Sequence, residues 1–321
     1  MSAQRFRAQI RLYLGLFIVP GVLVAQGARV AAQGVSFSSN VAVEQPLDSA
    51  TGGSSAAISG FSMPVPAAAG TLKPSLKTAA RLHATLDDLA KMLDQFRQNG
   101  NRHEEANVLC ATANAYRDLH EQQRSLESFH SALVLWRAIG DKRRQAETLS
   151  QIGDVYREWG FPDRAVPFYR QSLAIFSATN DAAAEAEAMN GLGVAYLSLR
   201  DKKRSLDYFN RALVAYEARH DRLGEARAMS NLGATYFSLV HDPMKAITTL
   251  QDALTRLEVL NDTANEANAL EIMGMAWKSL GKPEVASIEL RRALMIFHQI
   301  GSAEGENSIR RQLELLKGPS S

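Results

Sequence analysis

The side chains that most often carry out chemistry are present in this sequence, but not at the spacings that chemistry requires. Histidine is the commonest metal ligand and a frequent general base. The seven histidines are His83, His103, His120, His130, His220, His241 and His298. No two stand in the His-Glu-x-x-His arrangement that places both imidazoles on one helix face around zinc. The sequence therefore predicts no metal site.

Motifs for nucleophilic catalysis and for phosphate binding are also missing. Cys110 is the only cysteine, which excludes an intramolecular disulfide and a cysteine-based metal cluster. No Gly-x-Ser-x-Gly turn exists to present a nucleophilic serine. Gly52, Gly53 and Gly60 are not followed by the Lys-Ser/Thr pair of a phosphate-binding loop. We expect no catalytic residues, no cofactor and a protein that is not an enzyme.

The charge distribution argues against nucleic acid as a partner. The chain has 321 residues and a net charge of +2. Residues 1–32 hold four arginines and no acidic residue, while residues 79–321 hold 30 basic and 32 acidic residues. A nearly neutral body with interspersed signs lacks the basic surface that binds a phosphate backbone.

The first 32 residues have the three parts of a secretory signal peptide. Arg5, Arg7 and Arg11 precede an uncharged apolar run from Leu12 to Ala25, and Val30-Ala31-Ala32 supplies small residues for cleavage. The alternative is an uncleaved membrane anchor, because the uncharged run over residues 12–28 is just long enough to span a bilayer. We therefore expect an exported protein, periplasmic in a bacterium or secreted, with membrane contact only if this segment is retained.

Residues 33–78 have the composition of a flexible linker. They are rich in Ala, Ser, Gly and Pro, as in DSATGGSSAAISG and MPVPAAAGTLKP. No helical or strand period survives more than a few residues, so the segment cannot bury enough apolar area to offset its chain entropy.

An internal repeat fills most of the remaining chain, over residues 102–141, 142–181, 182–221, 222–262 and 263–302. The first half of each unit begins with a small residue: Ala106, Ala146, Ala186, Ala226 and Ala267. Seven residues on comes a second small position: Ala113, Gly153, Gly193, Gly233 and Gly274. Aromatic residues follow at Tyr116, Tyr156, Tyr196, Tyr236 and Trp277. These offsets keep one face of a helix apolar, and the interior glycine indicates that a neighbouring helix crosses there.

The second half of each unit predicts another helix after a short turn. Its large apolar position is held by Phe129, Tyr169, Phe209, Leu250 and Leu290. Four units end in aspartate, at Asp141, Asp181, Asp221 and Asp262, where the side chain can cap the next helix. The fourth unit has one extra residue, which we place in its turn around Val240, His241 and Asp242. We expect the aromatic column to be core.

This pattern resembles the tetratricopeptide repeat family, most directly at Ile152-Gly153-x-x-Tyr156, Leu192-Gly193-x-x-Tyr196 and Leu232-Gly233-x-x-Tyr236. The unit of about 40 residues is longer than the usual 34. It is similar to the long-helix subtype of kinesin light chains and many bacterial regulators. The resemblance implies an all-α fold, a right-handed α-solenoid of stacked antiparallel helix pairs. Residues 79–101 read as a degenerate opening repeat and residues 303–317 as a capping helix, together bounding a solenoid over 79–317.

The resemblance also implies a concave groove lined by the first helix of each repeat, where a partner protein or extended peptide binds. The positions that match the family's contact positions are Asn107, Asn114, Arg117, Glu147, Gln151, Asp154, Arg157, Glu187, Asn190, Val194, Leu197, Arg227, Asn231, Phe237, Glu271, Met275 and Lys278. The lining changes from polar and charged to more apolar along the groove. The family's Lys/Asn carboxylate clamp is not reproduced, and its asparagine ladder is incomplete.

The sequence favours a non-enzymatic scaffold for protein–protein interaction. One alternative is a peptide-sensing regulatory protein, but such relatives usually carry an effector domain, and here only a signal and a linker precede the repeats. Another is an accessory subunit of an envelope or secretion complex. An enzyme is the remaining alternative.

We predict that the native protein begins at Gln33, because signal peptidase would cut after Val30-Ala31-Ala32. N-terminal sequencing of protein from fractionated cells measures this directly. A chain that retains its first residues in the membrane fraction would show an anchor instead.

Overall fold

The computed structural model describes residues 76–316, and every regular element in that range is helical. The signal peptide or anchor over 1–32 and nearly all of the predicted linker lie outside the described residues. In chain order the elements are α2 (Leu76–Gln98), α3 (Arg102–Asp118), α4 (Gln122–Ile139), α5 (Lys142–Glu158), α6 (Pro162–Ala178), α7 (Ala182–Ser198), α8 (Lys202–Ala218), α9 (Arg222–Thr235), η1 (Tyr236–Val240), α10 (Pro243–Leu260), α11 (Thr263–Ser279), α12 (Pro283–Gln299) and α13 (Ala303–Leu316).

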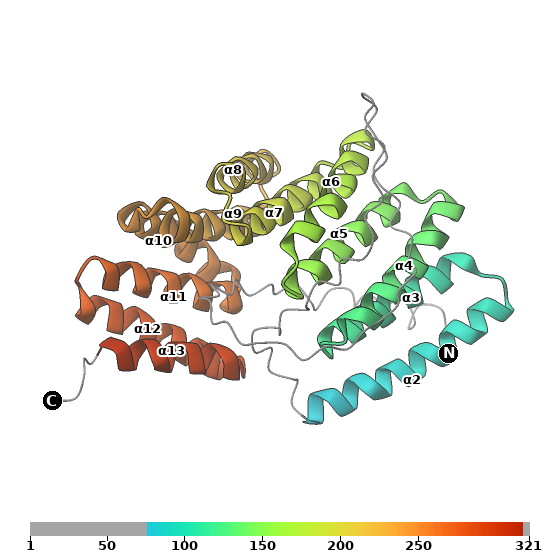
Figure 1. Ribbon diagram of the computed structural model, residues 1–321, viewed down its shortest axis with the longest axis horizontal. Coiled ribbons are helices and arrows are strands. Elements are labelled where there is room, and N and C mark those ends of the chain that lie inside the picture. The colour runs from blue at the N-terminus through green and yellow to red at the C-terminus, as the bar shows by residue number, and fades with distance from the viewer. Residues whose placement is uncertain (1–75, 317–321) are drawn as a thin grey trace, which may run out of the picture. The chain divides into compact units, whose positions relative to one another are not determined.

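The helices pack in consecutive antiparallel pairs. Each odd-numbered helix from α3 to α11 makes its most extensive contact with the helix that follows it, and each pair then packs against the next (Figure 1). We call the first helix of a pair helix A and the second helix B. The result is a right-handed α-solenoid, which confirms the predicted fold class.

Left-handed turns divide the chain at nearly constant intervals. A residue with positive φ follows each helix from α2 to α12: Gly100, His120, Gly140, Gly160, Asn180, Arg200, His220, His241, Asn261, Gly281 and Gly301. This conformation lets the last carbonyls of one helix accept backbone hydrogen bonds before the chain reverses. The aspartates then start the A helices as predicted, with Asp141 accepting from the Arg144 amide at 2.9 Å.

Small residues on helix A receive large side chains from helix B, as the glycine column predicted. A Cβ atom added at Gly193 would lie 2.5 Å from the Phe209 ring, and one at Gly233 would lie 2.5 Å from Cγ of Leu250. Phe209 and Leu250 are completely buried. The absence of a side chain on helix A is therefore what allows helix B to pack at this distance.

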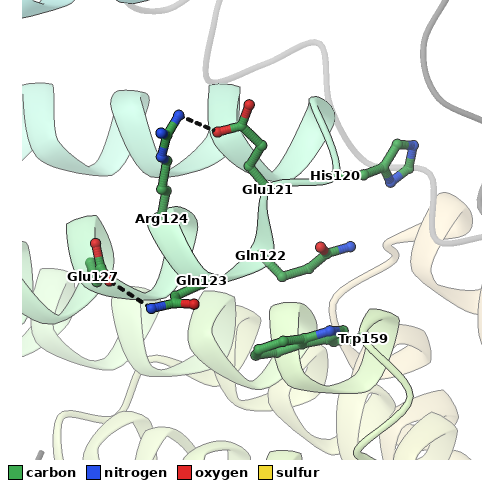
Figure 2. A pocket seen from close by; sticks show the side chains of 7 residues that line it. All are labelled: His120, Glu121, Gln122, Gln123, Arg124, Glu127 and Trp159. Carbon is green, nitrogen blue, oxygen red and sulfur yellow. Dashed lines mark hydrogen bonds and ion pairs between the residues drawn. The ribbon is translucent and has the colours of Figure 1, made fainter. Parts of the chain in front are cut away.

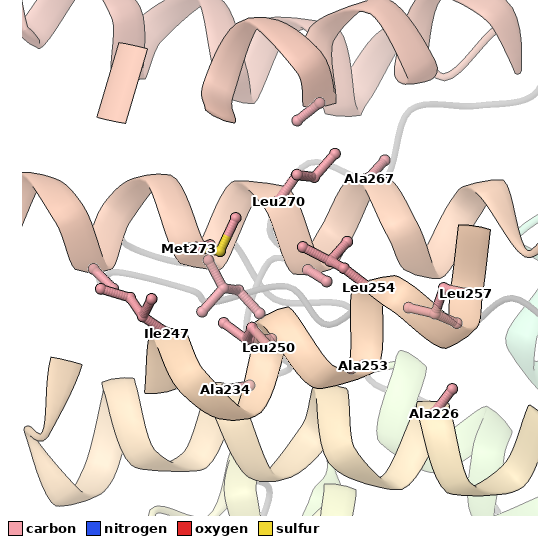
Figure 3. Packing of buried hydrophobic residues seen from close by; sticks show 14 of the residues in the cluster. Ala226, Ala234, Ile247, Leu250, Ala253, Leu254, Leu257, Ala267, Leu270 and Met273 are labelled. Carbon is pink, nitrogen blue, oxygen red and sulfur yellow. The ribbon is translucent and has the colours of Figure 1, made fainter. Parts of the chain in front are cut away.

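The core runs through the stack as a series of such contacts. Figure 3 shows its C-terminal part, where Leu250, Leu254 and Leu257 of α10 lie between α9 and α11 and meet Leu270 and Met273. Each helix B therefore buries apolar surface against its own helix A and against the helix A of the next pair. This shared burial is how repeats that cannot bury their own faces stabilise one another.

The aromatic column differs from the prediction that it is core. Tyr196 is buried, but Tyr116, Tyr156, Tyr236 and Trp277 are only half-buried. They lie at the end of helix A, where a cation from the start of helix B covers several of the rings: Arg124 over Tyr116, Arg204 over Tyr196, Lys245 over Tyr236 and Lys282 over Trp277. Cation–π contact stabilises these rings at the end of helix A.

The extra residue of the fourth repeat lies inside helix A and not in the turn where it was predicted. Residues Tyr236–Val240 form one turn of π-helix, which widens the end of α9. His241 then takes the left-handed conformation with φ of 59°, as His220 does at 57°. Because the extra residue is accommodated in the helix, the turn after it keeps the left-handed conformation of the other turns. The sequence pattern shows between which two repeat positions the extra residue lies, but it does not show whether that residue belongs to the helix or to the turn.

Replacing Gly193 with alanine should lower stability, although alanine favours a helix by about 1 kcal/mol over glycine. The added methyl group would overlap the buried Phe209 ring, and overpacking of this kind costs about 1–3 kcal/mol. Gly153→Ala should cost less, because its Cβ would meet the Tyr169 ring at 3.0 Å.

Urea unfolding monitored by circular dichroism measures both changes, and Phe209→Leu should partly restore the Gly193→Ala protein. Equal or increased stability of Gly193→Ala would show that helix B does not depend on this approach.

Candidate functional site

The A helices of neighbouring repeats lie close to one another along one side of the solenoid. Contacts join α5 to α7, α7 to α9 and α9 to α11, in addition to the contacts that each makes with B helices. Helices approach across a repeat only on the inner side of a curved stack. We call the surface that α3, α5, α7, α9, η1 and α11 form on this side the A-helix face, and all of the predicted groove residues belong to these elements.

Ion pairs fill the N-terminal part of the A-helix face. The Tyr169 hydroxyl donates to Oδ1 of Asp154 at 2.6 Å, and Nη2 of Arg157 lies 3.4 Å from the same oxygen. Arg157 also bonds Oε1 of Glu158 at 3.2 Å, and Glu158 approaches Nε of Arg117 at 3.9 Å. Burial raises the pKa of Glu158, while the two arginines lower it. Asp154, Arg157 and Arg117 are thus committed to a network between α3, α5 and α6.

Two further predicted residues, Glu147 and Arg227, are paired, Glu147 within its own helix and Arg227 across repeats. Glu147 accepts from Arg143 and Arg144, and Arg143 also reaches Oδ2 of Asp181 at 3.3 Å. Arg227 donates from both Nε and Nη2 to Oδ2 of Asp262, each at 3.0 Å. The aspartates that cap the A helices therefore also hold arginines of the preceding A helix.

Glu187 of α7 differs from these residues. It is exposed, and it has no hydrogen bond or ion pair within the described part of the chain. The pKa of Glu187 is raised, chiefly because the surrounding protein reduces its hydration and then because Asp221 repels its charge. Arg227 opposes this effect, whereas Glu147 and Asp154 add to it. Glu187 thus carries its charge among other acids with no direct partner.

Amide side chains connect α7 to α9. Nδ2 of Asn231 donates to Oδ1 of Asn190 at 3.0 Å, which leaves Nδ2 of Asn190 and Oδ1 of Asn231 for other partners. Asn107 bonds Glu104 and His103 of its own helix. Oδ1 of Asn114 is buried without a hydrogen bond among the described residues. Gln151 is half-buried on the same side.

The C-terminal part of the A-helix face is more apolar. Val194, Phe237 and Met275 are half-buried and pack on the adjoining core, so each presents the remainder of its surface to solvent. Leu197 is buried and contributes little to this surface. Phe237 belongs to the π-helical turn η1. Lys278 is exposed near the end of α11.

The last predicted residue, Glu271, is held by α13. Its Oε1 accepts from Oγ of Ser308 at 2.7 Å and from Nε2 of Gln312 at 2.6 Å. Burial raises the pKa of Glu271, and these two hydrogen bonds lower it. Helix α13 therefore closes the A-helix face at this end.

A shallow hollow outside this face offers less chemistry. His120, Glu121, Gln122, Arg124, Glu127 and Trp159 are among its lining residues (Figure 2). Glu121 and Arg124 pair at 2.7 Å, and Gln123 bonds Glu127 at 3.2 Å, so these four side chains are already engaged with one another. Among residues 76–316 no group of histidines, cysteines and acids could hold a metal ion. No helix in that range is long and apolar enough to cross a membrane.

Cys110 of α3 is not available for chemistry at the surface. It is buried, with its Sγ 3.7 Å from Oγ1 of Thr148 on α5. Burial raises the pKa of the thiol, which keeps it protonated and unreactive. The sequence also did not indicate Glu158, Ser308 or Gln312, because Arg117 and Glu271, which they contact on other repeats, are about one repeat away and no local motif marks such pairs.

Known proteins resemble this chain in sequence pattern and in fold. A family model described as tetratricopeptide repeat matches residues 105–178, 144–218 and 185–258. No curated protein sequence matches the chain significantly.

Among solved structures, BtubC from P. vanneervenii shares 19% identity at a TM-score of 0.56, over 70% of this chain and 92% of that one. Aspartyl phosphate phosphatase F from Bacillus subtilis gives 16% and 0.59, over 70% of this chain and 58% of its own. A Rap protein complexed with Competence and Sporulation Factor gives 16% and 0.54, over 74% and 71%. Likeness at these identities shows a shared fold.

Glu187→Gln should stabilise the protein at neutral pH by less than about 1 kcal/mol. The folded-state pKa of Glu187 is raised, so the wild type loses stability as pH rises from the ordinary glutamate value, about 4, through the folded value. Glutamine removes that loss, and the two proteins should converge in acid.

Urea midpoints at pH 7 and below pH 4 measure the difference. Glu217→Gln, on the exposed side of α8, controls for removal of one negative charge. A Glu187→Gln protein that is less stable at pH 7 would mean that the carboxylate has a stabilising partner.

Proposed function

This chain belongs to the tetratricopeptide repeat family, and we propose that it is a non-enzymatic scaffold whose A-helix face binds an extended segment of a partner protein. The proposal covers α3 to α11 and assigns no catalytic residue. Sequence features over residues 1–32 support an exported scaffold, periplasmic or secreted.

The single observation that carries the proposal is Glu187. Its carboxylate is exposed, and within the described residues it has no direct hydrogen bond or ion pair. A ligand that brings a cation or hydrogen-bond donors to this carboxylate gains a charge-assisted hydrogen bond, which is stronger than a neutral one. Most other charges on the A-helix face are already paired, so Glu187 is where a ligand gains most.

Two neighbouring features support an extended ligand. Asn190 lies within one helical turn of Glu187 on α7, and Asn231 of α9 is bonded to it; the two amides keep unused donor and acceptor groups. Side chains with these groups can hold a peptide backbone, which has both an N–H and a C=O at each residue. Val194, Phe237 and Met275 then offer apolar surface for side chains of the ligand.

A peptide-sensing regulator is the second candidate, favoured by one comparison. One structural neighbour was crystallised with Competence and Sporulation Factor, and another is described as the quorum sensor NprR from B. thuringiensis. The fold alone is shared with these proteins. We place the scaffold role first because the side chains of this chain's own A-helix face support it, whereas the regulator is supported only by a shared fold.

Affinity capture with the full chain tests the proposal, using Glu187→Lys and Glu217→Lys as a matched pair. Both glutamates are exposed, but Glu187 lies on the A-helix face of α7 and Glu217 lies on α8. We expect partners from an extract of the natural host to bind the wild type and Glu217→Lys, and binding to Glu187→Lys to fall about tenfold or more.

Equal capture by all three proteins would place binding elsewhere on the molecule. Reproducible absence of any partner would argue against a scaffold altogether.

A further inference from the structure

Within residues 76–316, helix α2 has the position of a helix B that no helix A precedes. It joins α3 through the same turn by which α4 joins α5: the Asn101 amide donates to the Phe96 carbonyl at 3.0 Å, and the Asp141 amide donates to the Trp136 carbonyl at 3.1 Å. Gly100 and Gly140 both have positive φ. Among the described residues, α2 packs against α3, whereas α4 packs against both α3 and α5 (Figure 1).

The repeat shows which side of α2 faces the missing helix. Tyr216 and Phe297 occupy the repeat position equivalent to Phe96. Their rings lie next to Gly224 and Gly305, which belong to the following helix A. Phe209 and Leu290 occupy the repeat position equivalent to Leu89. Their side chains lie next to Gly193 and Gly274, which belong to the helix A of the same pair. Phe96 therefore points to α3, and Leu89 points to the place where a preceding helix A would lie.

Burial at this place is incomplete. Leu126, Phe129 and Ala132 of α4 are exposed by only 7%, 0% and 0%. The corresponding residues of α2, three positions in the same register, are half-buried: Leu86, Leu89 and Met92. Thr85 is half-buried as well, where Ser125 is fully buried. Half-buried core positions are thus present on α2, and no helix of the described part of the chain covers them as the A helices do in the other repeats.

The other end of the solenoid is built differently. In α13 the positions that correspond to Ala267, Leu270 and Gly274 hold Asn307, Arg310 and Glu314, all exposed. A polar face of this kind ends a stack in water. It also means that α13 of a second copy would not present the small and apolar residues needed to cover α2.

The residues directly before α2 are poorly suited to be that helix. A preceding helix A linked by a short turn would fall near residues 57–73, where Pro64, Pro66 and Gly70 stand, with Pro74 next to it. A proline inside a helix costs about 3 kcal/mol. The sequence therefore favours a helix from another chain.

We propose that the face of α2 formed by Thr85, Leu86, Leu89 and Met92 binds an amphipathic helix of a partner protein, which takes the place of a helix A. The interface continues the one that joins helices A and B in each repeat, so its chemistry is defined. The partner helix carries an apolar stripe with a glycine or alanine opposite Leu89. This surface lies apart from the A-helix face and would add a second attachment point to the scaffold.

A labelled peptide of residues 181–199 is the probe, because it is a helix A with Gly193 at the required position. Fluorescence anisotropy with the full chain should show saturable binding. Leu89→Glu in the protein should weaken it on the order of tenfold or more, since one apolar side chain is replaced by a charge. Gln95→Glu, also on α2 but exposed, adds the same charge and should leave binding within about twofold.

Gly193→Leu in the peptide gives an independent control that leaves the protein unchanged. Leucine favours a helix over glycine, so a loss of affinity would come from the filled gap opposite Leu89. This arm also decides the matter if Leu89→Glu does not fold, which its circular dichroism spectrum would reveal.

Absence of binding at the highest soluble concentration, or equal binding by Leu89→Glu and Gln95→Glu, would overturn the proposal. Sedimentation equilibrium addresses a second copy as the occupant. A wild-type dimer that Leu89→Glu converts to monomer would show that α2 pairs with itself and not with a partner's helix A.

Discussion

The close approach of a large helix B side chain to a small helix A residue is the contact on which the rest of this structure depends. Phe209 against Gly193 and Leu250 against Gly233 set how near the two helices of a pair lie. The same helix B then packs against the next helix A, so every interior pair is stabilised from both sides. No pair could bury its apolar columns by itself, and this is why stability in such an array is a property of neighbours.

This constraint also explains where function can reside. The columns that build the core leave the remaining positions of helix A on the inner side, and cross-repeat links such as Arg227 with Asp262 use many of them. These links hold successive A helices in register and so present a fixed surface. What they leave over is a short stretch around Glu187, the Asn190–Asn231 pair and the apolar side chains of Val194, Phe237 and Met275.

The sequence predicted those features that repeat and missed those that depend on a single contact. Five copies of one pattern identify helix pairs, and glycine at a fixed place indicates a crossing helix. The aspartate caps follow from local hydrogen bonding. The π-helical turn at Tyr236–Val240 depends on whether an extra residue costs less free energy in the helix or in the turn, and no repeated position of the sequence shows this. Several of the half-buried aromatic residues at the end of helix A are covered by cations from helix B, and the aromatic positions alone do not reveal these contacts.

Prediction of the groove was limited in the same way. The family's contact positions placed the candidate residues on the A helices, with Phe237 on η1. They did not show which of these side chains are already bonded or buried within the protein. Asp154 and Arg157 bond Tyr169, Glu271 bonds α13, and Leu197 is buried. Each of these outcomes depends on side chains more than ten residues away in the sequence, so a local pattern carries no information on them.

Hydroxyl-radical footprinting of the full chain, free and bound to its partner, tests most directly whether the A-helix face is the working surface. Met275 and Phe237 lie on that face, while Met295 on α12 is 63% exposed and serves as an internal reference away from it. If the A-helix face is the working surface, binding will slow oxidation of Met275 and Phe237 and leave Met295 unchanged. Protection of Met295 with unchanged oxidation of Met275 and Phe237 would contradict it.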